Sequence, residues 1–150
     1  MGADDGMEVD AVLDTLGTAL ALQARSLVTM TVLAGTLRGM AGAGIKSRLR
    51  EFAAHEAEDT CRLTEKLSAL GGHPAVDLGE IRPAGDPQQA IRDLLDDEQK
   101  AIAALHAVIP HTGQEPRSEA LEHLLEHAIM RKQQQVDYLW HAADLAEPPA

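Results

Sequence analysis

Apolar residues recur three or four positions apart in four long segments of the chain, which is the spacing of one face of an α-helix. These segments span about 8–38, 47–70, 87–109 and 117–145. No segment alternates apolar and polar residues in the manner of a half-buried strand. The length of 150 residues is close to that of one ordinary domain. The sequence therefore predicts an all-α fold, with four helices in a single domain spanning 1–150.

Glycine and proline mark the breaks between these segments. The run 39–44 (GMAGAG) separates the first segment from the second. The pair Gly71-Gly72, with Pro74 just beyond, is typical of the C-terminal end of a helix. Asp86 followed by Pro87 is typical of an N-cap and a first helical position. We therefore expect helices that end and begin close to these residues.

The connection between the second and third predicted helices is much longer than the other two. Residues 71–85 could extend over about 50 Å at about 3.3 Å per residue, whereas a helix of about 24 residues is about 36 Å long. The linker can therefore return along the whole bundle and leave these two helices parallel. Short links make the other neighbours antiparallel. We expect two antiparallel pairs joined by one long crossover, and a simple up-down bundle with a loose loop is the alternative.

Composition and charge narrow the range of partners. The net charge of −11 disfavours nucleic acid and anionic membrane surfaces, which repel such a chain. One cysteine excludes an internal disulfide and a site built from several cysteines, and three aromatic residues disfavour a base-stacking surface. The first ten residues lack the features of a secretory signal, and no run of 18 apolar residues is present. We expect a cytoplasmic protein without nucleic acid or membrane partners.

Four stretches of the sequence carry a resemblance to a known family. The stretch 51–74 (EFAAHEAEDTCRLTEKLSALGGHP) resembles the second helix of bacterioferritins and Dps-type mini-ferritins, which commonly ends in a leucine, two glycines and a proline. The stretch 131–145 (RKQQQVDYLWHAADL) is similar to the end of the fourth helix of bacterioferritins. Residues 94–109 and 16–27 resemble the third and first helices. The resemblance implies a ferritin-like four-helix bundle with a long crossover between the second and third helices.

The family's di-iron centre takes one Glu from each of two helices and a Glu-x-x-His from each of the other two. Residue by residue, the resemblance carries the six ligand positions onto Gln23, Glu56, Asp59, Glu98, Lys132 and Gln135. Only Glu56 and Glu98 match, and Asp59 is a carboxylate in place of a histidine. The chain contains no Glu-x-x-His. The departures therefore predict a degenerate site without an active ferroxidase centre.

A protonated lysine carries a positive charge and no lone pair. Among Glu56, Asp59 and Glu98, the Lys132 ammonium would lie about where a metal would, and would supply the pairing that buried carboxylates require. We expect a salt-bridged core in a structural or assembly subunit without a cofactor, and co-assembly with an active ferritin-like relative is compatible with this role. The alternatives are an iron-storage protein that binds iron or one divalent cation, and an enzyme using Glu56, Asp59, Glu98 and Lys132 for acid–base chemistry.

Other candidate residues are weaker. His123 and His127 are four residues apart and could hold a metal from one helix face, but a polar exposed face explains them better. His55-Glu56-x-x-Asp59 only partly resembles a metalloprotease helix. Cys61 has polar neighbours, which favours a bystander over a nucleophile.

Two sites of the related proteins do not carry over. The first helix has no histidine, so the intersubunit iron site of the Dps type is absent. Bacterioferritins bind haem through a methionine that directly follows the Glu of the second helix, and Ala57 occupies that position here.

The first helix also suggests self-association. An outer apolar strip of this helix is expected to pair the bundles through their first and second helices, and it comprises Met30, Leu33, Ala34, Gly35 and Leu37. We expect a homo-oligomer that is at least a dimer, and a cage is compatible with the resemblance.

Overall fold

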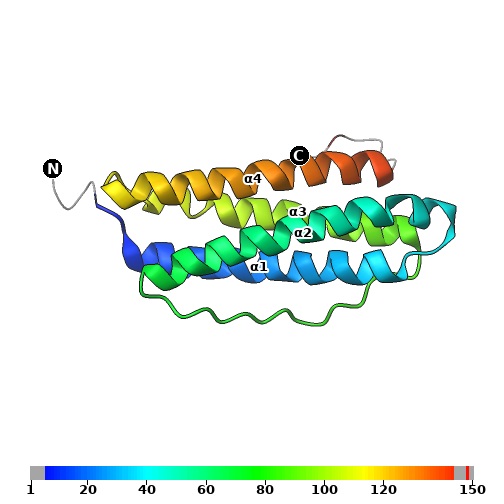
Figure 1. Cartoon of the computed structure of the whole chain (residues 1–150), viewed down its shortest axis with the longest axis horizontal. Helices are drawn as coiled ribbons and strands as arrows, with labels where there is room; N and C mark the ends of the chain where they lie inside the picture. The colour runs from blue at the N-terminus through cyan, green and yellow to red at the C-terminus, as the bar shows by residue number, and fades with distance from the viewer. Residues whose placement is uncertain (1–5, 144–147, 149–150) are drawn as a thin grey trace.

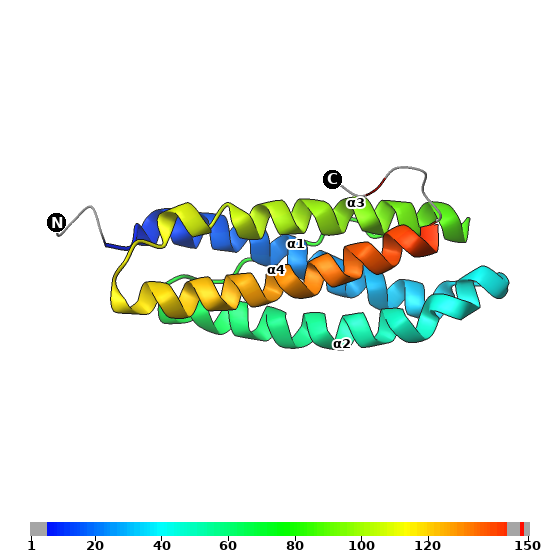
Figure 2. The same ribbon diagram turned by 90° about the horizontal axis from the view of Figure 1, so that it is seen from above.

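The computed structural model describes residues 6–143 and 148, and shows four long helices side by side (Figures 1 and 2). They are α1 (Val9–Thr36), α2 (Gly39–Ala69), α3 (Pro87–His106) and α4 (Pro116–Ala143), with a short 3-10 turn at Ile109–His111. No strand occurs among the described residues. The expectation of four helices is confirmed, and the predicted end of the fourth near residue 145 lies outside the described residues.

The long linker runs back along the side of the bundle, from the end of α2 to the start of α3 (Figure 1). Helices α1 and α2 are antiparallel, as are α3 and α4, while α2 and α3 point in the same direction (Figure 2). The predicted crossover is therefore confirmed, and the simple up-down alternative is wrong. Arg25 of α1 holds the linker in place, because its guanidinium donates hydrogen bonds to the backbone oxygens of Leu78 and Glu80.

The expected break over 39–44 is wrong, because α2 already begins at Gly39. The chain reverses within two extended residues, Leu37 and Arg38, followed by a positive φ of 78° at Gly39. A Cβ on Gly42 would lie 3.2 Å from the Leu37 backbone, so this glycine lets the new helix pass close to the turn. The GMAGAG run is thus the first turn of a helix rather than a loop.

The predicted end of α2 and start of α3 are found as expected. Gly71 has a φ of 91°, and the Gly72 amide donates to the Leu67 carbonyl at 2.9 Å, which closes the helix. The Asp86 side chain accepts a hydrogen bond from the Gln89 amide at 3.0 Å, so it caps α3. The third helix ends at His106, three residues earlier than expected, and the 3-10 turn follows at Ile109–His111.

The core consists of two apolar clusters at opposite ends of the bundle. One cluster is built from buried residues late in α1 and α4 and early in α2 and α3: Met30, Leu33, Leu37, Leu49, Phe52, Ala90, Ile91, Leu94, Leu95, Ile102, Val136, Leu139 and Ala143. The other uses the opposite helix ends: Met7, Val12, Leu16, Ala19, Leu20, Leu63, Leu67, Leu105, Val108, Leu121, Leu125 and Ala128. The predicted outer strip is therefore wrong for Met30, Leu33 and Leu37, which face the core.

Helix α1 is apolar on more than its core side. It is long and apolar enough to cross a membrane by length and composition alone, and 44% of its most apolar 18-residue window is buried inside the bundle. A buried core helix passes the same test, so this feature is weak support for a membrane span.

Candidate functional site

Buried polar residues form a layer between the two apolar clusters. Each helix contributes to it at a position where its apolar run is interrupted, and residues three apart on a helix lie on one face. The layer contains Gln23 and Ser26 of α1, Glu56 and Asp59 of α2, Glu98 of α3, and Lys132 and Gln135 of α4, none of them more than 2% exposed. All six positions singled out from the sequence are therefore buried.

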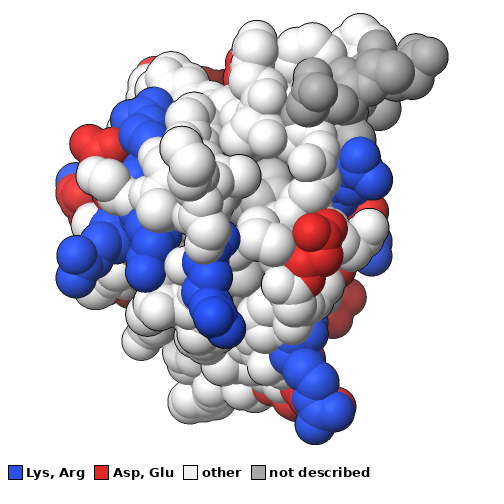
Figure 3. All heavy atoms as spheres, turned by 90° about the vertical axis from the view of Figure 1, so that its right-hand side faces the viewer, with Lys and Arg blue, Asp and Glu red and all other residues white. Residues whose placement is uncertain are grey.

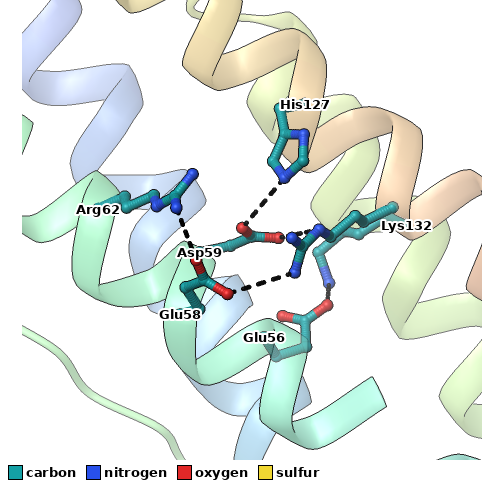
Figure 4. Close-up of polar contacts among 7 residues, drawn as sticks. Glu56, Glu58, Asp59, Arg62, His127 and Lys132 are labelled. Atoms are coloured by element: carbon teal, nitrogen blue, oxygen red, sulfur yellow. Dashed lines mark hydrogen bonds and ion pairs between the residues drawn. The ribbon is translucent and has the colours of Figure 1, made fainter. Parts of the chain in front are cut away.

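Lys132 is the centre of this layer. Its ammonium is fully buried and donates to Glu56 Oε1 at 2.7 Å and to Glu98 Oε2 at 2.9 Å. One lysine from α4 thus joins carboxylates from α2 and α3, and Figure 4 shows its contact with Glu56. Short charge-assisted hydrogen bonds at both carboxylates offset the cost of burying the ammonium.

Gln135 lies one turn further along α4 and faces the same two oxygens. With its amide nitrogen turned toward the carboxylates, it donates to Glu56 Oε1 at 3.0 Å and to Glu98 Oε2 at 2.9 Å. Only this orientation lets the amide form hydrogen bonds, because the opposite one turns its oxygen toward other hydrogen-bond acceptors. The Lys132 ammonium and the Gln135 amide therefore both donate to the same oxygen of Glu56 and to the same oxygen of Glu98.

The other oxygens of the two glutamates have no hydrogen-bond partner among the described residues. Burial raises the pKa of Glu56 to about 7, because desolvation of the carboxylate outweighs the attraction of Lys132. For Lys132, burial opposes the charged form, but the Glu98 and Glu56 carboxylates overcome it and hold the lysine pKa above its usual range. The ammonium of Lys132 therefore stays charged at neutral pH, whereas the carboxyl group of Glu56 titrates close to neutral pH.

Asp59 differs from the expectation, because its neighbours are not those of Glu56. The nearest basic side chains to Asp59 are Arg131, with Nε at 3.7 Å, and His127, with Nε2 at 3.8 Å, both from α4. Arg131 also lies 3.9 Å from Glu58, and Glu58 pairs with Arg62 at 2.6 Å on the surface of α2 (Figure 4). A second, outer group of charges therefore covers the α2–α4 side of the buried layer.

This outer group changes the charge balance of the layer. Three carboxylates against the single ammonium of Lys132 would leave an excess of negative charge. Arg131 supplies a second cation close to Asp59, and a protonated His127 would supply a third. Burial still raises the pKa of Asp59, since desolvation outweighs the attraction of Arg131 and His127.

The remaining candidates are not brought together. Gln23 is fully buried, and neither atom of its amide has a hydrogen-bond partner among the described residues. His123 and His55 are exposed, and His127 faces Asp59 without a hydrogen bond. Cys61 is exposed and free, with only a 3.9 Å contact to Glu65. Within residues 6–143, no cluster of three or more His, Cys, Asp or Glu side chains could hold a metal.

Comparison with known families settles which fold family these helices represent. The model of the ferritin-like domain matches residues 13–147, nearly the whole chain. The chain belongs to the ferritin family. No curated protein matched the sequence.

Two solved ferritin-like structures share this fold. One is a ferritin-like di-iron-carboxylate protein from Bacillus anthracis, with a TM-score of 0.82 and 19% identity over 95% of this chain and 99% of the other. The second is a dodecameric thioferritin, the bacterioferritin-related protein of Bacteroides fragilis, with a TM-score of 0.81 and 16% identity over 92% of this chain and 87% of the other. At these identities the likeness concerns the fold.

The residues in the layer do not fit the di-iron group of the family. A metal needs lone pairs that converge on it, and Glu56 and Glu98 supply them. Lys132 and the amide nitrogen of Gln135 instead present N–H donors to those same carboxylates. The ammonium occupies the hydrogen-bonding positions of one oxygen of each glutamate, so a cation there would meet a positive charge at close range.

Arg131 and Glu58 were missed by reasoning from the sequence. The signal for Arg131 was its spacing of four residues from His127, which places both on one face of α4. Nothing in that spacing identifies Asp59 as the residue opposite them, because this depends on how α4 is rotated against α2.

Proposed function

We propose that this chain is a non-oxidising member of the ferritin family, with a structural or assembly role. The observation that carries the proposal is the Lys132 ammonium, fully buried and 2.7 and 2.9 Å from two glutamates of the layer. A fixed positive charge there does what a bound metal does for the fold, since it neutralises buried carboxylates from two helices. It performs no redox chemistry.

Self-association is the second part of the proposal. Among the structural neighbours, the protein from Bacteroides fragilis is described as dodecameric. Half-buried apolar residues of α1 outside the two core clusters, such as Leu22, Leu27 and Val28, support a homo-oligomer of at least two chains. Co-assembly with an active relative of the same fold is part of this proposal. We propose a cytoplasmic protein without nucleic acid or membrane partners.

Two alternatives remain distinct from this proposal. An iron-storage protein would use the two matching glutamates, with iron or one divalent cation bound beside them. An acid–base enzyme is favoured by one observation, the pKa of about 7 for the buried Glu56. A substrate would have to open the bundle to reach this residue, because Glu56, Glu98 and Lys132 are each at most 1% exposed.

The test is the binding and oxidation of added ferrous iron by the purified chain. We expect no stoichiometric binding, and oxidation in air no faster than in buffer. The matched control is Gln23→Glu/Asp59→His/Lys132→Glu/Gln135→His, which restores the family ligand at all four departed positions and should gain iron binding. Two irons per parent chain, with the absorption of an oxo-bridged pair, would overturn the proposal. A monomer by light scattering at high micromolar concentration would overturn the assembly role.

A further inference from the structure

The charges of this acidic protein are unevenly distributed along the chain. Residues 15–50 contain five basic residues and no acidic one, although acidic residues outnumber basic ones 24 to 13 overall. Four of the five lie at or after the α1–α2 turn: Arg38, Lys46, Arg48 and Arg50. Figure 3 shows this end of the bundle, where Lys and Arg side chains, with Asp and Glu side chains among them, stand around a mostly uncharged surface. Residues 38–50 therefore form a basic segment in an acidic protein, and its cations favour anions at close range.

An open groove of about 720 Å³ lies beside this end, between the last turns of α1 and the first half of α2. Its lining residues are small or polar: Thr31, Ala34, Gly35, Ala43, Lys46, Ser47, Arg50 and Ala53. A Cβ added to Gly35 would meet nothing within 4 Å, so the glycine leaves the floor of the groove open. The groove thus combines a shallow apolar floor with a cationic edge.

The two cations of the groove have no competing partner. Lys46 and Arg50 are four residues apart and so lie on the same face of α2, and neither forms an ion pair with any residue that the structure describes. Their neighbour Arg48 is different, because its guanidinium pairs with Glu51 at 2.9 Å and lies over the rings of Phe52 and Tyr138. Of the three cations between residues 46 and 50, Lys46 and Arg50 are therefore the two without an ion pair among the described residues.

We propose that this groove binds an organic anion, an acidic group carried on an apolar body. The acidic group, a carboxylate, sulfonate or phosphate, pairs with Lys46 and Arg50, and the Ser47 hydroxyl can donate to it. The apolar body covers Ala34, Gly35 and Ala53, which an inorganic ion is too small to reach. The site is independent of the buried layer, since none of its lining residues belongs to that layer.

Two probes that differ only in the acidic group test this site. 8-Anilinonaphthalene-1-sulfonate carries the anion, and N-phenyl-1-naphthylamine has the same aromatic body without it. Binding of each is followed by fluorescence and calorimetry at low and physiological salt. We expect the sulfonate to bind one site per chain, more weakly at higher salt. Lys46→Gln/Arg50→Gln should weaken sulfonate binding at least tenfold and leave the neutral probe unchanged.

Two further variants distinguish the groove from the basic end as a whole. Gly35→Leu should fill the groove and abolish binding of both probes, while circular dichroism shows an intact fold. Arg38→Gln/Arg92→Gln removes two exposed cations outside the groove lining and should change sulfonate binding less than twofold. No binding by the parent chain, equal losses in both double variants, or full binding by Gly35→Leu would each overturn the proposal.

Discussion

Two neighbouring groups of charges join α2 to α4, and they differ in burial and in the distances between their charged atoms. The inner group places Lys132 2.7 Å from Glu56 and 2.9 Å from Glu98, with all three side chains at most 1% exposed. The outer group places Arg131 3.7 Å from Asp59 and 3.9 Å from Glu58, with side-chain exposures of 20% for the arginine, 3% for Asp59 and 49% for Glu58. The inner contacts are hydrogen bonds, whereas the distances from Arg131 to Asp59 and Glu58 are too long for hydrogen bonds.

The comparison shows that burial, rather than the number of charges, decides what an ion pair does for the fold. A buried pair adds little net stability over an apolar pair, yet breaking it leaves a charge without compensation. A partly exposed pair keeps much of its hydration, so its loss is screened by water. We therefore expect the inner group to determine whether the bundle folds at neutral pH, and the outer group to adjust its stability only slightly.

The largest expected effect follows from replacing the inner ammonium. Lys132→Met leaves Glu56 and Glu98 buried without their cation, which should lower the free energy of unfolding by about 3–5 kcal/mol at pH 7. Without the lysine, the folded-state pKa of Glu56 should rise further above its usual value, because the attraction that lowers it is lost. Stability should therefore recover as the pH falls toward about 5, because protonation removes the repulsion. Urea unfolding at a series of pH values measures this.

The control for this experiment is Lys100→Met, which removes an exposed lysine of α3. It should change the free energy of unfolding by less than about 0.5 kcal/mol. If Lys132→Met unfolds like the parent at pH 7, Lys132 has no structural role and the account of the inner group is wrong.

A smaller effect is expected from Glu56→Gln, which sharpens the account of the inner group. The folded-state pKa of Glu56 is about 7, above its usual value of 4.5, so the folded protein takes up a proton more readily. This carboxyl therefore contributes stability that is lost as the pH rises through 7, about 1 kcal/mol between pH 6 and pH 8. Glu56→Gln should remove that part of the pH dependence. If the stability of Glu56→Gln depends on pH as that of the parent does, a group other than Glu56 titrates near pH 7.

The smallest effects are expected in the outer group. Arg131→Met removes a cation from the buried Asp59 and the exposed Glu58. It should cost about 1 kcal/mol or less at low salt, because Arg131 is 20% exposed and lies too far from either carboxylate for a hydrogen bond. Arg62→Ala, which removes the exposed partner of Glu58, should cost about 0.3–0.5 kcal/mol. Both losses should shrink in 1 M salt because the charges are screened. A loss from Arg131→Met as large as that from Lys132→Met would erase the distinction between the two groups.

The fold could be predicted from sequence because its signals are local. Helical periodicity, the Gly71-Gly72 stop and the Asp86 cap each act within a few residues, and the length of the linker determined the crossover. Two predictions failed where packing decides. The glycines at 39–44 predict a loop, but in the structure Gly42 allows the start of α2 to pass close to Leu37. The sequence shows that Met30, Leu33 and Leu37 are apolar but not which way they face. The packing of the bundle places all three in the core.

The positions of Lys132, Glu56 and Glu98 could also be predicted from the sequence. The resemblance to the family fixes the helical register, so Lys132 was expected between Glu56 and Glu98, and their distances agree with that expectation. Asp59 was expected beside the same lysine, and its contacts are instead with Arg131 and His127. Adjacent residues on α4 point about 100° apart, so the sequence alone does not say which cation meets which carboxylate.

The central claim is that a charged, hydrogen-bonded lysine ammonium fills the buried layer, and nitrogen NMR of the lysine side chains tests it most directly. The chain has four lysines, of which Lys132 alone is buried. In a protein labelled at the lysine side-chain nitrogen, exchange with water should broaden the exposed ammonium signals near pH 7. One slowly exchanging ammonium signal should persist and disappear in Lys132→Met. Absence of a persistent signal, or a signal at the position of a neutral amine, would contradict the account.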